Sequence, residues 1–197
     1  RKTGKIAVSL KDDDELFAVR KTQGNEDIFI AASNGKLVRF NEDNIRIMGR
    51  NAGGVKAMNV DGSDVVGVTT SLDGEYILAI TNKGYGKISP LSEYRVMTNR
   101  GGKGVKTIRV GEKNGELVSI KGVNGDEDLL VTTDKGIVIR ISLDQINSTS
   151  RNTMGVRIIK LDKDSIVASV AVIDKEEEEE LTEEVTVKEQ EVTETES

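Results

Sequence analysis

The sequence repeats itself with a period of about 50 residues, and this repetition restricts the fold more than any other feature. A glycine that opens a short apolar segment recurs at spacings of 50, 50 and 51 residues, in segments 4–8, 54–58, 104–108 and 155–159. Strand-rich units of this length stack into propellers and related arrays of blades. We therefore expect three and a half repeats, at about residues 4–53, 54–103, 104–154 and 155–173.

Each complete repeat has the pattern of about four short strands. A second apolar segment follows each glycine-opened segment, at residues 16–19, 65–68, 117–120 and 166–170. A hairpin comes next, with turns at Gly35, Gly84 and Gly136, where glycine supplies the positive φ that a tight turn requires. No part of residues 1–173 keeps a helical period. The sequence predicts an all-β fold.

The residue composition excludes most familiar catalytic chemistries. The chain has no histidine and no cysteine, so it lacks imidazole and thiolate metal ligands, disulfides and the usual nucleophile–base pairs. There is no apolar run long enough to span a membrane and no signal-peptide pattern, which makes the cytoplasm the expected location. Because the sequence begins at Arg1 rather than at Met, we expect a fragment or a processed product of a longer protein.

Charge is divided unevenly along the chain. Residues 174–197 contain twelve acids and two bases, a net charge of −10, whereas residues 1–173 contain 26 bases and 22 acids, a net charge of +4. The acidic segment has too little apolar surface to offset the entropy of ordering, so we expect a disordered tail. The contrast favours a body that binds a polyanion and a tail that competes for it, although an acidic tail is equally typical of a solubility element.

Basic residues recur in register around the glycines that open the repeats. An arginine stands four residues before the glycine and a base two residues after it, which gives the candidates Arg50, Arg100, Arg151, Lys56, Lys106 and Arg157. Lys103 adds a cation directly before Gly104. A lone loop charge is usually just solvated, but register across three repeats favours a positive stripe. Glycine beside Arg and Lys lets the backbone approach a phosphate and offers free N–H donors, which suits duplex DNA.

Two further arginines are weaker candidates for DNA binding. Arg39 and Arg140 each lie four residues after a hairpin glycine. In the middle repeat this position is occupied by Ile88, and Lys87 comes one residue earlier. A base therefore stands at this position in two of the three hairpins, whereas the cations around the repeat-opening glycines recur in all three repeats.

The segment Arg100-Gly101-Gly102-Lys103-Gly104 resembles the signature box of the C-terminal domain of the bacterial DNA gyrase A protein. The family box reads Gln, Arg or Lys, Arg, Gly, Gly, Lys or Arg, Gly; five of its seven positions agree, and Thr98 and Asn99 differ. The resemblance covers residues 1–173 and includes an acidic tail. It implies a β-pinwheel, a propeller-like disc whose blades exchange strands and which wraps duplex DNA around a basic rim, with Gly101, Gly102 and Gly104 as box glycines.

The resemblance also implies partners and a setting. Such a domain works with the rest of the gyrase A protein and with the gyrase B protein in an A2B2 enzyme, in the bacterial cytoplasm and associated with the nucleoid. Its DNA wrapping supports ATP-dependent negative supercoiling, while the cutting tyrosine, ATP and Mg belong to other regions, so we expect this fragment to be non-catalytic and without cofactor.

Two alternatives stay open: the equivalent C-terminal domain of topoisomerase IV, and a propeller that binds protein partners. With aromatic residues at 3%, the chain has few anchors for a protein interface and few platforms for stacking single-stranded bases.

Overall fold

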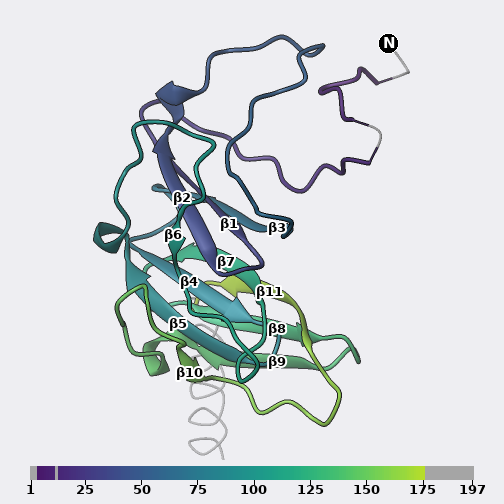
Figure 1. Ribbon diagram of the computed structural model, residues 1–197. Coiled ribbons are helices and arrows are strands. Elements are labelled where there is room, and N and C mark those ends of the chain that lie inside the picture. The colour runs from purple at the N-terminus through teal and green to yellow at the C-terminus, as the bar shows by residue number, and fades with distance from the viewer. Residues whose placement is uncertain (1–3, 12, 176–197) are drawn as a thin grey trace, which may run out of the picture.

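A computed structural model describes residues 4–11 and 13–175, in which the chain forms eleven β-strands and three short 3₁₀-helices (Figure 1). The predicted disordered tail therefore lies almost wholly outside the described residues. Within the described part, no helix is long and apolar enough to cross a membrane.

Three antiparallel hairpins form the frame of the fold. They are β1 (Asp27–Ala32) with β2 (Lys36–Asn41), β4 (Tyr76–Thr81) with β5 (Tyr85–Pro90), and β8 (Asp128–Thr133) with β9 (Val138–Ser142). The predicted turn glycines have φ values of 77° at Gly35, 76° at Gly84 and 78° at Gly136. Each hairpin is followed by a 3₁₀ turn, namely η1 (Glu42–Asn44), η2 (Leu91–Glu93) and η3 (Leu143–Gln145). All three hairpin predictions are confirmed.

Strands from later repeats complete each hairpin into a sheet. The first sheet has the order β3-β1-β2-β6, the second β10-β5-β4-β7 and the third β11-β8-β9. The added strands are β3 (Val65–Thr70), β6 (Val105–Lys106), β7 (Leu117–Val123), β10 (Val156–Arg157) and β11 (Val167–Ile173). In the two four-stranded sheets, the hairpin takes one outer strand from the next repeat and the other from the repeat after that. This is the strand exchange of a β-pinwheel, and the predicted all-β fold class is confirmed.

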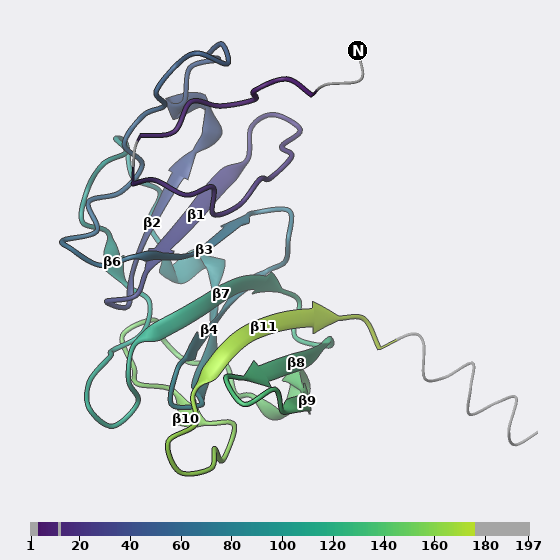
Figure 2. The ribbon, with the colours of Figure 1, turned by 90° about the vertical axis from the view of Figure 1, so that its right-hand side faces the viewer.

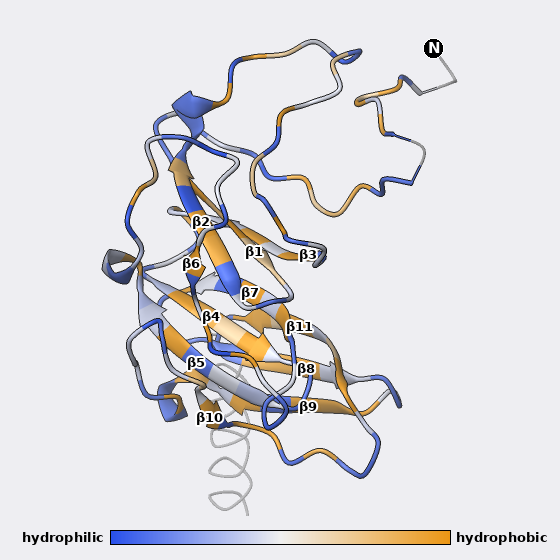
Figure 3. Ribbon diagram, in the orientation of Figure 1, coloured by the Kyte–Doolittle hydropathy of each residue, from blue (hydrophilic) through white to orange (hydrophobic). Residues whose placement is uncertain are grey.

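The sheets pack face to face, with apolar layers between them. Figure 2 shows β4 and β7 between the first sheet above and the third sheet below, and Figure 3 shows apolar residues gathered in the strands. Ile77 and Ala79 share a core cluster with Phe29 of the first sheet, whereas Leu78 and Ile80 belong to the cluster shared with the third sheet. Because successive strand residues face opposite ways, the middle sheet is buried on both faces.

Three predicted strands do not form in the described residues. Segments 4–8, 16–19 and 54–58 have no strand structure, so the prediction of four strands in every complete repeat is wrong there. In later repeats the equivalents of segments 4–8 and 54–58 pair with the hairpin two repeats earlier, and the equivalent of segment 16–19 pairs with the hairpin one repeat earlier. The described residues contain no hairpin at those positions for these three segments. The apolar side chains of the first two segments stay exposed, as in Ile6 at 77% and Phe17 at 55%, whereas Met58 of the third segment is buried in the core of the first sheet. Pairing, rather than local sequence, decides whether such a segment becomes a strand.

Candidate nucleic-acid interface

Two loops carry the predicted box residues, and both enter a sheet through a glycine. Residues 98–104 lead into β6 and residues 150–155 lead into β10, on the left-hand side of Figure 1. Gly104 and Gly155 have φ values of 75° and 73°, in the left-handed region that favours glycine. A Cβ atom at Gly104 would lie 2.4 Å from the carbonyl oxygen of Leu37 on β2. These glycines therefore fix the point at which each loop joins the hairpin.

The loop of residues 98–104 pairs with the glycine-opened segment of the preceding repeat. The Gly101 amide donates to the Ala57 carbonyl at 2.7 Å, and the Asn59 amide donates to the Gly102 carbonyl at 2.9 Å. The amide of Gly101 is thus used inside the protein, unlike the free donor that the box predicts. Lys56 directly precedes Ala57, so a cation of one repeat is held beside the box of the next.

Arg100 is also fixed by a backbone contact. Its Nε donates to the Asn44 carbonyl at 3.2 Å, just after β2, and the side chain is half-buried. This contact attaches the box arginine to the turn that follows the first hairpin.

The loop of residues 150–155 repeats the arrangement one repeat later. The Arg109 amide donates to the Thr153 carbonyl at 2.8 Å, and Arg151 Nη1 donates to the Lys106 carbonyl at 3.2 Å. Lys106 therefore lies between its own box loop and the next one. The two loops place cations from successive repeats in a chain of neighbours.

We call these cations the basic stripe: Lys56, Arg100, Lys103, Lys106, Arg151 and Arg157. All are exposed except Arg100 and Arg151, which are half-buried. Arg157 lies on β10, where its guanidinium is 5.4 Å from the centre of the Tyr85 ring and donates to the Tyr85 hydroxyl at 3.2 Å. Arg50 is exposed in a turn, and no contact within the described residues ties its side chain to the stripe.

An acid, Asp61, lies against the cations of the stripe. The carboxylate of Asp61 lies 3.2 Å from Lys103 Nζ and 3.4 Å from Lys36 Nζ. Hydrogen bonds from Lys103 and then from Lys36 lower the pKa of Asp61, so it is ionised at neutral pH. Lys36 pairs with Lys106 across β2 and β6, a neighbour that the sequence analysis missed because the pairing joins repeats that lie far apart in the chain.

Arg39 and Arg140 occupy a different environment. Arg39 is paired with Asp27 at 2.6 Å, and its side chain is 18% exposed. Arg140 is paired with Asp128, also at 2.6 Å, and its hydrogen bond lowers the pKa of that carboxyl. The structure places both arginines in ion pairs on the hairpins and not in the box loops. A DNA contact by either arginine stays a prediction.

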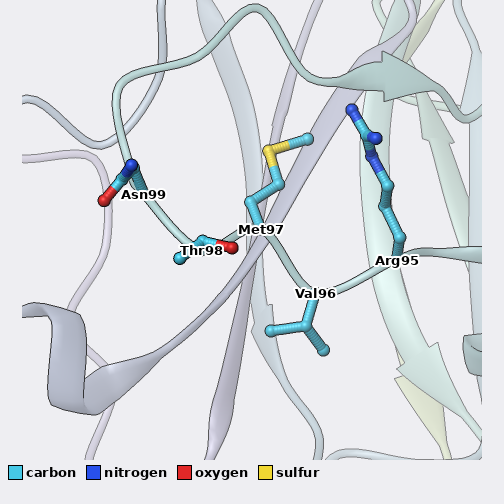
Figure 4. A pocket seen from close by; sticks show the side chains of 5 residues that line it. All are labelled: Arg95, Val96, Met97, Thr98 and Asn99. Atoms are coloured by element: carbon cyan, nitrogen blue, oxygen red, sulfur yellow. The ribbon is translucent and has the colours of Figure 1, made fainter.

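The start of the first box loop borders a surface cavity of about 290 Å³. Figure 4 shows Arg95 and Met97 pointing to one side of the chain and Val96 to the other. The Met97 amide donates to the Arg39 carbonyl at 2.7 Å, which attaches the loop to β2. Thr98 and Asn99, where the box departs from the family pattern, are exposed.

The described residues contain no group of three or more acidic side chains arranged to hold a metal ion. The stripe instead presents lysine and arginine side chains at the protein surface, and such a row of cations is suited to binding an extended polyanion.

Comparison with known proteins gives the family. A family model described as DNA gyrase C-terminal domain, beta-propeller, matches residues 1–23, 26–71, 75–124 and 127–174. The chain therefore belongs to this family of gyrase-type C-terminal domains.

Curated relatives agree. The chain is 49% identical over 173 residues to the DNA gyrase A protein of Ureaplasma parvum and 46% identical over 179 residues to that of Staphylococcus epidermidis. The alignments cover 87% and 89% of this chain but 20% of each relative, so the chain spans about a fifth of their length.

Solved structures show the same fold. A DNA gyrase A C-terminal domain superposes with a TM-score of 0.73 at 22% identity, covering 87% of this chain and 59% of that one. A C-terminal domain of DNA topoisomerase IV gives a TM-score of 0.79 at 25% identity, covering 86% and 53%.

Proposed function

We propose that this chain binds duplex DNA along the basic stripe, without reading its sequence. One observation carries the proposal: each box loop lies on the glycine-opened segment of the preceding repeat, joined to it by the Gly101–Ala57 and Arg151–Lys106 contacts. Cations from several repeats thus form one surface instead of isolated patches. Duplex DNA presents a regular line of phosphates, and a line of Lys and Arg side chains neutralises it by releasing counterions.

The arrangement of the sheets supports a proposal that the duplex is wrapped. The stripe passes from the first sheet to the second, and a duplex that keeps contact with successive loops has to bend with them. Arg and Lys on glycine-rich loops contact phosphates rather than base edges, so affinity should depend on how easily the duplex bends more than on its sequence.

In a whole enzyme this chain would serve as the wrapping part of DNA gyrase. The relatives are gyrase A proteins, and we propose that the domain acts with the rest of such a protein and with the gyrase B protein to support ATP-dependent negative supercoiling. ATP and Mg would be bound elsewhere, and the setting would be the bacterial nucleoid. The similarity to a topoisomerase IV domain keeps that enzyme as a second candidate, although identities of 46% and 49% to gyrase A proteins favour gyrase.

The proposal is tested by titrating labelled duplexes of two unrelated sequences at several salt concentrations. We expect equal affinities for the two, falling with salt by about 0.9 log units per log unit of salt for each phosphate neutralised, so that contacts by the six stripe cations give a slope of roughly −5. Relaxing a closed plasmid in the presence of the chain tests wrapping, because wrapped DNA retains a changed linking number. A flat salt response, or no duplex binding, would favour the protein-binding alternative.

A further inference from the structure

Lys87 lies in the middle of β5 with 1% of its surface exposed. Its Nζ donates to the backbone carbonyl of Ser150 at 2.6 Å. Ser150 directly precedes Arg151 and opens the second box loop. Burying an ammonium group costs free energy that only hydrogen bonds or opposite charges offset, so packing alone does not account for a lysine at this place.

The neighbouring backbone joins the same two elements. The Thr149 amide donates to the Ile88 carbonyl at 2.9 Å, and the Arg151 amide donates to the Glu93 carboxylate at 3.4 Å. The second box loop is therefore attached to β5 and η2 immediately around the buried lysine.

The first sheet has a corresponding arrangement. Arg39 on β2 donates from Nη1 to the carbonyls of Leu91 and Tyr94, both at 2.8 Å, and its own carbonyl accepts the Met97 amide. Leu91, Tyr94 and Met97 belong to the segment that leads into the first box loop. In both four-stranded sheets, a cation on the second hairpin strand thus holds a segment at or before the box loop that joins that sheet.

We propose that Lys87 is a positioning residue that holds the second box loop so that Arg151 faces the DNA, as Arg39 does for the first box loop. The role in DNA binding rests on the proposed function, whereas the attachment of the loop does not. Arg39 was a candidate for phosphate contact because of its position after the hairpin glycine. In this proposal the Arg39 guanidinium instead holds the segment that leads into the first box loop.

This role makes the loop sensitive to pH. Burial lowers the pKa of Lys87 to about 8, an effect that the charge of Glu93 opposes and the charge of Arg151 reinforces. Tyr94, which Glu93 and Arg151 also face, stays neutral in this range because burial raises its pKa. Once Lys87 loses its proton, the hydrogen bond to Ser150 is no longer charge-assisted and becomes weaker.

The experiment uses the full chain, with Lys87→Met as the variant and Lys83→Met as its control. Lys83 is an exposed lysine on the turn between β4 and β5, so both variants lose one positive charge. At pH 7 we expect hydrogen exchange of amides 149–154 to accelerate about tenfold in Lys87→Met and to stay unchanged in Lys83→Met, because loss of a charge-assisted bond releases the loop. Duplex affinity should fall about fivefold, and Lys87→Met combined with Arg151→Ala should be no weaker than Arg151→Ala alone.

The pH response separates positioning from a packing role. Between pH 7 and 9 duplex affinity should fall in the wild type more than in Lys87→Met. Over the same range, the folding stability of the wild type should rise relative to Lys87→Met, because above pH 8 the folded state has released a proton that the unfolded state still binds, and removing that proton costs less free energy as the pH rises. Glu93→Gln, an exposed change that is expected to fold normally, should move the midpoint of the affinity change to lower pH.

The outcomes distinguish the two proposals. Unchanged amide exchange in Lys87→Met, or additive effects of Lys87→Met and Arg151→Ala on affinity, would overturn the positioning role even if the chain binds DNA. Accelerated exchange at amides 149–154 together with no duplex binding by the wild type would leave the loop attachment standing and overturn the proposed function.

Discussion

Segments 54–58 and 104–108 share a sequence pattern but not a structure. Both open with a glycine in the left-handed region, with φ of 74° at Gly54 and 75° at Gly104, and both carry an exposed lysine two residues later. Val105 and Lys106 pair with β2, whereas residues 54–58 form no strand. Around Gly54 a Cβ atom would meet no atom within 4 Å, while at Gly104 it would collide with the carbonyl of Leu37.

This difference separates the properties that a repeat has by its own sequence from those that depend on other repeats. The glycine takes its backbone conformation in both copies, so that property is set by the repeat itself. Strand formation needs the hairpin two repeats earlier, so it is set by the neighbours. Equivalent substitutions in segments 54–58 and 104–108 can therefore be compared directly.

The largest expected effect is on stability. Gly104→Ala introduces both an unfavourable positive φ and a collision with β2, and we expect it to lower the free energy of unfolding by about 3 kcal/mol or more, against about 1 kcal/mol for Gly54→Ala, which introduces only the backbone strain. Urea unfolding of the two variants measures the difference. Equal losses would mean that the approach to Leu37 does not constrain the sheet.

Duplex binding gives the second pair. Arg100→Ala with Lys106→Ala should weaken binding about tenfold, whereas Arg50→Ala with Lys56→Ala should weaken it about threefold, because the first pair removes two cations of the basic stripe and the second pair removes only Lys56. The free energy of unfolding should change by no more than about 0.5 kcal/mol in either double variant, since charges at or near the surface contribute little to stability. Fluorescence anisotropy at low salt gives the affinities. Losses of equal size would mean that Arg50 contributes to DNA binding as much as a cation of the basic stripe.

Sequence patterns captured the local part of this fold. The three hairpins were predicted at the right glycines, because a tight turn depends on a few adjacent residues. Residues 16–19 and 54–58 were predicted wrongly for the opposite reason, since their patterns are strand-like but their pairing partners would lie in other repeats. The sequence of a single repeat does not show which strands will pair with a hairpin of another repeat.

The same limit applies to the site. The register of Arg100, Arg151 and Lys106 predicted that these cations form a common surface, and the structure places Arg151 against Lys106 and Arg100 in the loop before it. Asp61 and Lys36 were not foreseen, because their proximity to Lys103 depends on long-range pairing. Burial of Lys87 was equally invisible, because a strand pattern does not reveal that both faces of the middle sheet are covered.

The acidic tail provides the third prediction. Truncation after Lys175 keeps the ion pair of this residue with Asp144 at 2.9 Å and removes residues 176–197, which carry a net charge of −10. A tethered polyanion competes with DNA phosphates for cations, so we expect duplex binding to strengthen about threefold at low salt, with the gain shrinking as the Debye length falls toward about 3 Å near 1 M salt. Affinities of the full and truncated chains at two salt concentrations measure this. No gain at low salt would reduce the tail to a solubility element.

The smallest expected effect concerns the acid within the stripe. Asp61 holds Lys103 and Lys36, so part of their charge is already neutralised before DNA arrives. Asp61→Asn should strengthen duplex binding about twofold, a modest gain because exposed ion pairs are weak and screened. Asp64→Asn is the matched control, since it removes the same charge from a nearby acid that makes no ion pair within the described residues.

The lowered pKa of Asp61 keeps its carboxylate ionised well below neutrality, so the gain should persist when binding is measured at pH 5.5 instead of pH 7. In a Lys103→Ala background the gain should shrink, because the cation that Asp61 mainly neutralises is gone. An equal gain from Asp64→Asn would mean that net charge, and not the contact with Lys103, sets the affinity. A gain that survives unchanged in Lys103→Ala would place this lysine outside the DNA path and narrow the basic stripe to the residues fixed by the box loops.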